Sequence, residues 1–243
     1  MSQNAFDLTD HVAVVTGGGR GIGEGIAKAY ADAGAAVVVA ARRTDEIERV
    51  AADIVTAGGV ATAVTTDVTD REALGELAAR AVATHGPLTT WVNNAGGSPD
   101  RMPLIDLDRA SWDSCLALNL TAVWEASVVA AAAISDGGCI INISSMATVD
   151  PFPGLFAYAA AKASTNLMAK SCYNEGREFG IRAFTVAPGA VETEMLRSIF
   201  AESIIPKENA LDPAVVAQVI WECVHGERRD QNGETIYVPS PEM

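Results

Sequence analysis

Residues 11–34 read HVAVVTGGGRGIGEGIAKAYADAG, and this stretch decides the fold. Its first six residues form a short apolar run typical of a buried strand, which stops at Gly17, Gly18 and Gly19. An amphipathic segment follows and closes at Gly34, which predicts a helix. Glycine lets the backbone approach a pyrophosphate, and a helix N-terminus offers free N–H groups to it. The order strand, glycine turn, helix therefore predicts a nucleotide site, whereas the glycines by themselves would indicate only a turn.

The rest of the chain alternates apolar, β-branched runs with helical segments. Further strands are expected at residues 35–41, 60–68, 88–92, 139–145, 181–187 and 234–238. Helices are expected at residues 44–57, 70–84, 108–134, from 157 onward, and at 212–224. This alternation predicts an α/β fold with a doubly wound, parallel, seven-stranded sheet (a Rossmann fold), and we expect a single domain over residues 1–243. An apolar stripe at residues 195–205 has helical spacing and is either core or a lid over substrate.

The chain is acidic, with a formal net charge of −14. That charge disfavours nucleic acid and anionic membranes as partners. No apolar run reaches ~18 residues without interruption, so no membrane span is expected. The N-terminus lacks the features of a secretion signal, and we expect a cytoplasmic protein. The cysteines form no C-x-x-C pair and the histidines are scattered, which predicts free thiols and no metal site.

The end of the second expected strand indicates which nucleotide is bound. An NAD site usually has an Asp or Glu there that accepts from the ribose hydroxyls. This chain has Ala40 and Ala41, then Arg42 and Arg43, and no acid before Asp45. A guanidinium binds a phosphate through two hydrogen bonds, whereas a carboxylate repels it. The pair therefore favours NADP(H) over NAD(H); the alternative interpretation is two solvated arginines at the start of a helix.

Polar residues also follow the third and fourth strands, and one lies within an expected helix. Asp67 either accepts from an adenine amino group or caps the next helix. An Asn-Asn-Ala-Gly run at residues 93–96 could line a cofactor pocket without bulk, although it is also an ordinary turn sequence. Asn119 lies inside the helix expected at residues 108–134, where Asn is unfavourable unless its amide has a partner. A buried polar role is therefore expected for Asn119.

Ser145, Tyr158 and Lys162 are the residue types of an acid–base site. Ser145 ends the fifth expected strand, and Tyr158 and Lys162 are four residues apart, so they share one face of the following helix. A free phenol titrates near ~10, and a nearby ammonium favours the phenolate and so lowers the pKa of the phenol. Ser145 could hydrogen-bond the substrate oxygen that Tyr158 would protonate. By itself, a Tyr four residues before a Lys would be an ordinary surface pair.

In combination, these motifs resemble those of the short-chain dehydrogenase/reductases in their compact, single-domain form. The resemblance covers residues 11–193, in the family's order and spacing: Thr16-Gly17-x-x-x-Gly21-x-Gly23, Asp67, Asn-Asn-Ala-Gly at 93–96, Asn119, Ser145, Tyr158-x-x-x-Lys162 and Pro188-Gly189. The tail, HGERRDQNGETIYVPSPEM at residues 225–243, lacks the Gly-Gly pair that many relatives have after the last strand. This departure leaves the substrate and subunit contacts open, but not the chemistry.

The resemblance implies hydride transfer between NADP(H) and a carbonyl or secondary alcohol. It implies that Tyr158 is the general acid or base and that Lys162 lowers its pKa and bonds the nicotinamide ribose. Ser145 would orient the carbonyl, and Asn119 would hold a proton-relaying water. The implied cofactor contacts are Gly17, Gly21, Ile22 and Gly23 at the turn, Arg20, Arg42 and Arg43 at the 2′-phosphate, Asp67 and Val68 at the adenine, and Asn94, Ala95, Gly96, Pro188, Gly189, Val191 and Thr193 toward the ribose and nicotinamide.

A ketone (carbonyl) reductase is the expected activity, with a 3-oxoacyl-carrier-protein reductase or a steroid or secondary alcohol dehydrogenase as alternatives. A nucleotide-binding sensor is the non-enzyme alternative, and the intact catalytic set argues against it. The expected substrate is a small molecule, because the candidate pocket positions are mostly apolar: Gly97, Ser98, Met146, Val149, Phe152, Phe156, Met195 and Phe200. The resemblance also implies a homodimer or homotetramer, formed through the helices that carry Asn119 and Tyr158.

Overall fold

The protein folds as a parallel sheet with helices on both faces, which confirms the predicted fold class. The computed structural model describes residues 7–97 and 101–241. Within them, the strands lie in the order β3-β2-β1-β4-β5-β6-β7, and neighbours are parallel. From β1 the chain adds β2 and β3 on one side, and it then returns to add β4 to β7 on the other side of β1. The strand order therefore reverses between β1 and β4, and parallel sheets bind ligands at such a switch point. The strands are β1 (Val12–Thr16), β2 (Ala36–Ala41), β3 (Val60–Thr65), β4 (Leu88–Asn93), β5 (Ile134–Ile143), β6 (Arg182–Pro188) and β7 (Thr235–Val238).

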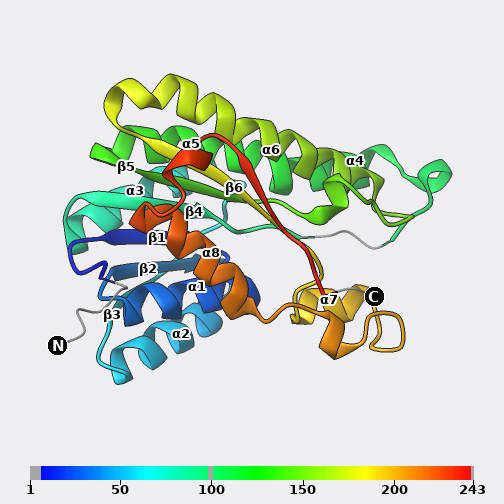
Figure 1. The fold of residues 1–243 in the computed structure, drawn as a ribbon, viewed down its shortest axis with the longest axis horizontal. Coiled ribbons are helices and arrows are strands. Elements are labelled where there is room, and N and C mark those ends of the chain that lie inside the picture. Colours follow the sequence, from blue (N-terminus) through cyan, green and yellow to red (C-terminus); the bar gives the residue numbers. More distant parts are fainter. Residues whose placement is uncertain (1–6, 98–100, 242–243) are drawn as a thin grey trace.

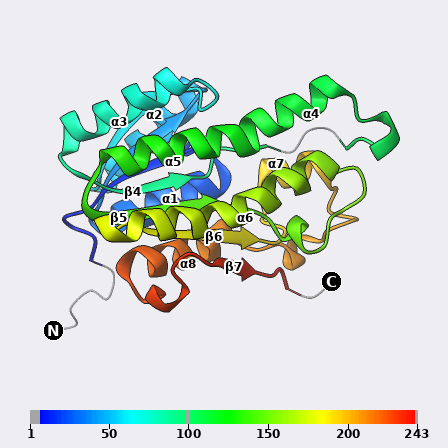
Figure 2. The same ribbon diagram turned by 90° about the horizontal axis from the view of Figure 1, so that it is seen from above.

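Helices cover both faces of the sheet (Figures 1 and 2). Within β1, Ala13 and Val15 pack into the core on one face, whereas Val12 and Val14 pack into the core on the other. Because both faces are buried, β1 is apolar from Val12 to Val15 and does not alternate with polar residues. One face is covered by α1 (Gly21–Asp32), α2 (Thr44–Thr56) and α8 (Pro213–His225), and the other by α3 (Arg71–His85), α5 (Ala122–Ala133) and α6 (Phe156–Gly176).

The helix predicted at residues 108–134 forms over Arg109–Ala133 and contains a π-helical turn. It consists of α4 (Arg109–Leu116), a π-helical turn (Ala117–Thr121) and α5. Asn119 lies in the π turn, and its Nδ2 donates to Cys115 O at 3.0 Å. A side-chain amide that takes a carbonyl of the preceding turn competes with the helix's own hydrogen bonds, so the widened turn has a local cause. Asn119 is fully buried, as expected.

Two other element boundaries differ from the prediction. β5 begins at Ile134, well before Cys139, because its pairing with β4 continues through a register shift. The apolar stripe at residues 195–205 forms only the short helix α7 (Glu194–Ile199). Phe200 then turns extended and packs its ring 4.8 Å from that of Phe152. Tertiary packing of one ring, which the helical spacing cannot show, sets the end of α7.

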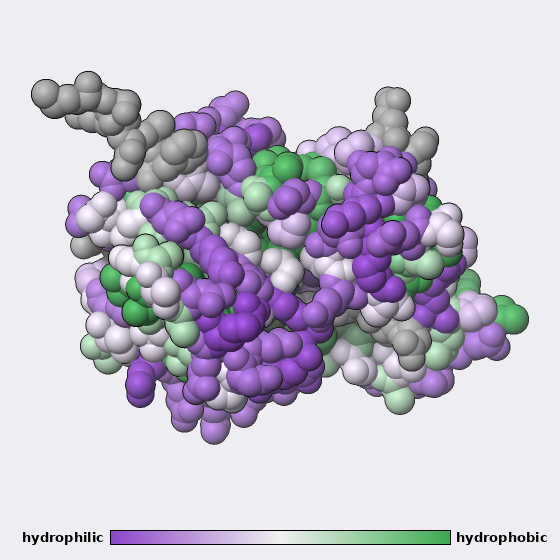
Figure 3. All heavy atoms as spheres, turned by 90° about the horizontal axis from the view of Figure 1, so that it is seen from below, coloured by the Kyte–Doolittle hydropathy of each residue, from purple (hydrophilic) through white to green (hydrophobic). Residues whose placement is uncertain are grey.

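The helical stretch Arg109–Ala133 is long and apolar enough to cross a bilayer by length and composition, with a mean hydropathy of 1.5. In the fold, its α5 part covers the sheet and contacts α3, β4 and β5. Ala126 and Ala130 are buried there, whereas Trp124 and Val128 remain exposed. Seen from below, the molecular surface is mostly hydrophilic, with apolar residues in separate patches (Figure 3).

The cysteines are free thiols, as predicted. Cys115, Cys139 and Cys223 are buried, and Cys172 is half-buried. Burial raises the pKa of Cys139 to about 12. The reactive thiolate is therefore disfavoured at Cys139, which behaves as a small apolar core residue.

Candidate active site

A cleft of about 980 Å³ runs along the carboxyl ends of the strands. This volume is at the upper end of the roughly 300–1,000 Å³ typical of small-molecule pockets, which is room for a dinucleotide and a substrate. The residue directly after each strand lines it: Gly17 after β1, Arg42 after β2, Thr66 after β3, Asn94 after β4, Ser144 after β5, Gly189 after β6 and Pro239 after β7. The sheet thus builds the whole cleft from its strand ends.

All residues predicted to contact the cofactor line this cleft except Asp67. Asp67 Oδ1 accepts from Thr69 N at 3.0 Å and from Thr69 Oγ1 at 2.8 Å. The capping role given to Asp67 as an alternative is performed by Asp70, whose side chain accepts from the N–H groups of Glu72 and Ala73. Asp67 therefore closes a turn, and its prediction as a cofactor contact or a helix cap is not supported by its position.

The glycine turn is packed so closely that two of its positions have no room for a side chain. A Cβ on Gly23 would lie 2.2 Å from Gly17 O and 2.5 Å from Asn94 Nδ2. Gly17 has a φ of +64°, and a Cβ there would lie 2.9 Å from Ala95 Cα. Asn94 braces the turn from within, because its Nδ2 donates to Thr16 O at 2.8 Å and Gly17 O at 3.1 Å. The turn is therefore a backbone cradle of the kind that holds phosphates.

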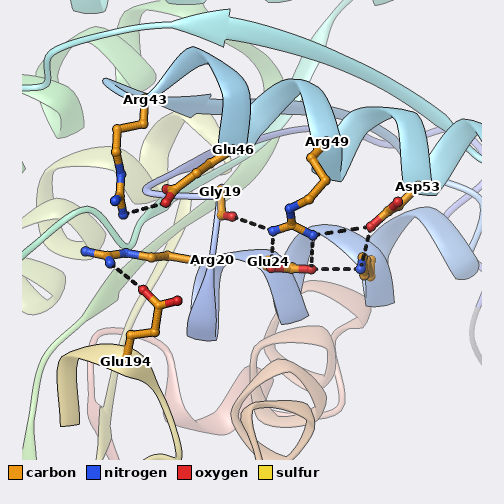
Figure 4. A network of polar contacts seen from close by, with 9 residues as sticks. Gly19, Arg20, Glu24, Arg43, Glu46, Arg49, Asp53 and Glu194 are labelled. Atoms are coloured by element: carbon orange, nitrogen blue, oxygen red, sulfur yellow. Dashed lines mark hydrogen bonds and ion pairs between the residues drawn. The ribbon is translucent and has the colours of Figure 1, made fainter. Parts of the chain in front are cut away.

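An ion-pair network fixes this turn from outside the cleft (Figure 4). Arg49 of α2 donates through Nη2 to Gly19 O at 3.0 Å and to Glu24 Oε2 at 2.8 Å. Lys28 Nζ donates to Glu24 at 2.8 Å and to Asp53 at 3.1 Å. The network joins α1, α2 and the turn. Sequence reasoning missed it, although the spacing of Glu24 and Lys28 could have indicated that pair, whereas the pairing of Arg49 with Glu24 joins two helices.

Glu24 makes the stability of this network depend on pH. Hydrogen bonding from Arg49 lowers the pKa of Glu24 from 4.5 to about 2. Because the folded-state pKa is depressed, Glu24 stabilises the fold above pH 4.5, and this contribution is lost as the pH falls toward 2. We expect Glu24→Gln to lower the free energy of unfolding at pH 7 by about 1 kcal/mol, allowing for solvent screening, and the difference from wild type to vanish near pH 2.

Urea titrations at a series of pH values measure this effect. Asp32→Asn is the matched control, because Asp32 is an exposed acid on the same helix that forms no ion pair among the described residues. A constant difference between Glu24→Gln and wild type across the acid range would contradict the prediction.

The cleft wall after β2 carries both signs of charge. Arg42, Arg43 and Glu46 line it. Arg43 Nη2 lies 2.6 Å from Glu46 Oε1, and Arg20 Nη1 lies 2.7 Å from Glu194 Oε2 (Figure 4). Sequence reasoning missed both acids. Glu46 could have been found, since it lies one helical turn beyond Arg43, but no local pattern relates Arg20 to Glu194 in α7.

Ser145, Tyr158 and Lys162 line the same cleft. Tyr158 and Lys162 come from the first two turns of α6 and share one face, with Lys162 Nζ 5.8 Å from the centre of the Tyr158 ring. Lys162 Nζ also donates to Ile143 O at 2.7 Å, which ties α6 to the end of β5. Ser145 follows β5, so the strand end and the helix start together bring these three side chains to one place.

The acidity of Tyr158 differs from the prediction. Burial raises the pKa of Tyr158 to about 12, and hydrogen bonding with Ser145 offsets only part of this rise. Burial also lowers the pKa of Lys162 to about 8. The pKa of Tyr158 is thus raised and not lowered as expected, because desolvation outweighs the hydrogen bond with Ser145. At neutral pH Tyr158 is held as the neutral phenol, the form that can give up a proton.

The side chain of Asn119 holds the segment after β4. Its Oδ1 accepts from Gly97 N at 3.2 Å, and its Nδ2 donates to Gly97 O at 2.9 Å. A Cβ on Gly96 would lie 3.0 Å from Asn119 Oδ1 and 3.2 Å from Lys162 Nζ, so Gly96 lies between the two side chains. Asn119 itself does not line the cleft. The water-holding role implied for it stays a prediction.

The remaining cleft wall is mostly apolar. Among the predicted pocket positions, Gly97, Met146, Phe152, Met195 and Phe200 line it. Val149 and Phe156 do not, and their side chains are exposed instead, while Ser98 lies outside the described residues. Further apolar lining residues include Leu118, Leu155, Leu196, Ile199 and Ile205.

The C-terminal tail forms part of the wall, which accounts for its unusual sequence. Pro239, Ser240 and Pro241 line the cleft. Ser240 Oγ accepts from Ala190 N at 2.7 Å, and a Cβ on Gly189 would lie 2.4 Å from Ser240 Oγ. The tail is thus held against the loop that follows β6 by the hydrogen bond from Ala190 N to Ser240 Oγ.

Comparison with known proteins agrees with this geometry. The chain matches the family described as short chain dehydrogenase over residues 11–203. It is 34% identical to the 7alpha-hydroxysteroid dehydrogenase of Escherichia coli K12, over 82% of this chain and 78% of the relative. It is 32% identical to the 2,3-dihydro-2,3-dihydroxybenzoate dehydrogenase of Bacillus subtilis, over 82% of this chain and 77% of the relative. An uncharacterized oxidoreductase of Mycobacterium tuberculosis is 36% identical, over 86% of this chain and 81% of the relative.

Solved structures match over nearly the whole length. A short chain dehydrogenase from Burkholderia cenocepacia J2315, in complex with NADP, superposes with a TM-score of 0.88 at 31% identity. The match covers 96% of this chain and 97% of that one.

Proposed function

The chain belongs to the short-chain dehydrogenase family, and from this premise we propose that it transfers a hydride between NADP(H) and a ketone or secondary alcohol on an apolar, ring-bearing substrate. The observation that carries the proposal is one cleft that holds the glycine turn, the arginines after β2 and the Ser145, Tyr158 and Lys162 side chains together. A cradle without side chains at Gly17 and Gly23 fits a dinucleotide pyrophosphate.

The chain's own residues supply the proton and the geometry. When bound, the nicotinamide gives or accepts the hydride. Tyr158, kept protonated by burial, donates its hydroxyl proton to the carbonyl oxygen, and Ser145 orients that oxygen by hydrogen bonding. Lys162, fixed by its bond to Ile143 O, holds a positive charge beside the phenol at neutral pH.

The choice of NADP(H) is supported by charge. Arg42 and Arg43 line the cleft directly after β2, and a structural relative was solved in complex with NADP. We expect Arg42→Ala to raise KM for NADPH by about tenfold or more and to change KM for NADH by less than about twofold, because a guanidinium–phosphate bond is lost only with NADPH. Initial-rate kinetics with both cofactors measure this.

Arg80→Ala is the control for Arg42→Ala, since Arg80 is an exposed arginine of α3 that does not line the cleft. The same cofactor preference in Arg42→Ala and wild type would mean that Arg42 is only a solvated residue.

The substrate class is supported by the cleft wall and by relatives. The wall is lined by Phe152, Phe200 and several aliphatic side chains, which suits a bulky apolar ring. Relatives of the chain include a 7alpha-hydroxysteroid dehydrogenase and a cis-4-hydroxycyclohexanecarboxylate dehydrogenase. Incubation with NADPH and a panel of cyclic and linear ketones, while following nicotinamide absorbance, tests the proposal. Turnover of no cyclic ketone, or of linear 3-oxoacyl thioesters alone, would refute the ring-bearing substrate.

We also propose a homodimer or homotetramer formed through α5 and α6. Trp124 and Val128 of α5 and Leu167 of α6 are exposed apolar side chains on these helices. Contact with a second copy would remove them from water. Light scattering measures the assembly size.

A further inference from the structure

Glu46 is an acid built into the cleft wall that the proposed cofactor chemistry does not use. It lies in the first turn of α2 and lines the cleft with Arg42 and Arg43. Its side chain packs directly on the glycine turn, because a Cβ on Gly19 would lie 2.9 Å from Glu46 Cβ and 3.3 Å from Glu46 Oε2. The Glu46 side chain is 21% exposed, whereas that of Arg43 is 52% exposed. The carboxylate therefore packs against the turn, and the arginine is the more exposed partner.

In the ion pair between Arg43 and Glu46, the carboxylate neutralises a guanidinium that could otherwise bind a phosphate. Arg43 Nη2 lies 2.6 Å from Glu46 Oε1 (Figure 4). Arg20 is likewise paired with Glu194 at 2.7 Å. Among the described residues, Arg42 alone of the three arginines forms no ion pair with an acid. The local charge is thus much less positive than the three arginines in the sequence suggest.

We propose that Glu46 is a specificity-determining residue that reduces the preference for 2′-phosphorylated nucleotides. This inference rests on the proposed NADP(H)-dependent function. A phosphomonoester at the arginines competes with Glu46 for the Arg43 guanidinium, and the nearby carboxylate of Glu46 repels the phosphate dianion. A nucleotide that lacks the 2′-phosphate leaves the Arg43–Glu46 pair intact and avoids this repulsion. Glu46 therefore narrows the difference in affinity between NADP and NAD.

The test measures the binding of NADP⁺, NAD⁺ and 2′,5′-ADP to the Glu46→Gln variant by calorimetry. Glu46→Gln keeps the side-chain shape and removes the charge. We expect the Kd for NADP⁺ and 2′,5′-ADP to fall by about three- to tenfold and the Kd for NAD⁺ to change by less than about twofold. Asp45→Asn is the matched control, since it removes the same charge from the same helix turn but from an exposed side chain outside the cleft.

Each outcome has a distinct meaning. An NADP⁺/NAD⁺ ratio in Glu46→Gln equal to that of Asp45→Asn overturns the inference while leaving the proposed function standing. A higher Kd for NAD⁺ in Glu46→Gln than in wild type also overturns the inference, because Glu46 would then be a direct contact of the ribose. The double variant Arg43→Ala/Glu46→Gln should lose most of the gain for NADP⁺ if Arg43 is the released group. Failure of the wild-type protein to bind either dinucleotide would instead refute the proposed function, and the inference with it.

Discussion

Replacement of Tyr158 by Phe is expected to lower kcat at least ~10²–10⁴-fold, while the Kd for the nicotinamide cofactor changes by less than about threefold. The substitution removes only the hydroxyl that would donate the proton, and the ring continues to fill its buried position in the cleft wall. Lys162 keeps its bond to Ile143 O, so the cofactor-binding wall remains formed. Single-turnover kinetics together with fluorescence titration of NADPH separate the chemical step from binding.

Tyr30→Phe is the matched control for this experiment. Tyr30 is also fully buried, but its hydroxyl has no hydrogen-bond partner among the described residues and it lies in the core beneath α1. Removing an unsatisfied buried hydroxyl is neutral or stabilising. We expect Tyr30→Phe to keep wild-type turnover. Wild-type turnover in Tyr158→Phe would show that another group supplies the proton.

Replacement of Gly23 by Ala is expected to abolish nucleotide binding and to lower the free energy of unfolding by about 2–3 kcal/mol. The added methyl group would lie 2.2 Å from Gly17 O and 2.5 Å from Asn94 Nδ2. The first contact is with backbone, so relief requires the turn itself to move. Asn94 would then lose its bonds to Thr16 O and Gly17 O, which brace the cradle. Denaturant unfolding and NADP⁺ titration measure the two effects.

Gly75→Ala, on another helix, is the control for Gly23→Ala, because we expect it to raise stability and to leave nucleotide binding unchanged. Gly75 lies within α3, and a Cβ there would meet nothing within 4 Å. Alanine has a higher helix propensity than glycine, so this variant should be more stable by roughly 0.5–1 kcal/mol and should bind nucleotide normally. Equal stability and equal binding of the two variants would contradict the close packing of the glycine turn.

The sequence was enough to predict the sheet, the glycine turn and the cluster of Ser145, Tyr158 and Lys162, because each depends on local patterns. Periodicity marks strands and helices, and residues after strand ends meet at one edge of a parallel sheet. The π-helical turn at Asn119 was not predictable, since the Asn119 side chain also bonds to Gly97, and that bond forms only when the helix packs against the segment after β4.

The charge environment was the least predictable part. The sequence shows Arg42 and Arg43, but it does not show that α2 packs on the turn and brings Glu46 over Gly19. Similarly, the pKa of Tyr158 depends on how deeply the fold buries it, and the spacing to Lys162 carries no information about burial. Spacing indicates which groups are near one another, whereas their acidity depends on the water that packing removes.

The hydrogen bond from Ala190 N to Ser240 Oγ joins the cleft wall to the segment after β7, at the edge of the sheet. Among the described residues, β7 pairs only with β6 and is therefore an edge strand of the sheet. Edge strands exchange their amide hydrogens more readily than central strands do. Fraying of β7 would carry Ser240 away from Ala190 and open one wall of the cleft. Nucleotide occupancy and protection of this last strand are therefore thermodynamically linked, so that filling the cleft slows deuterium uptake at the far end of the chain.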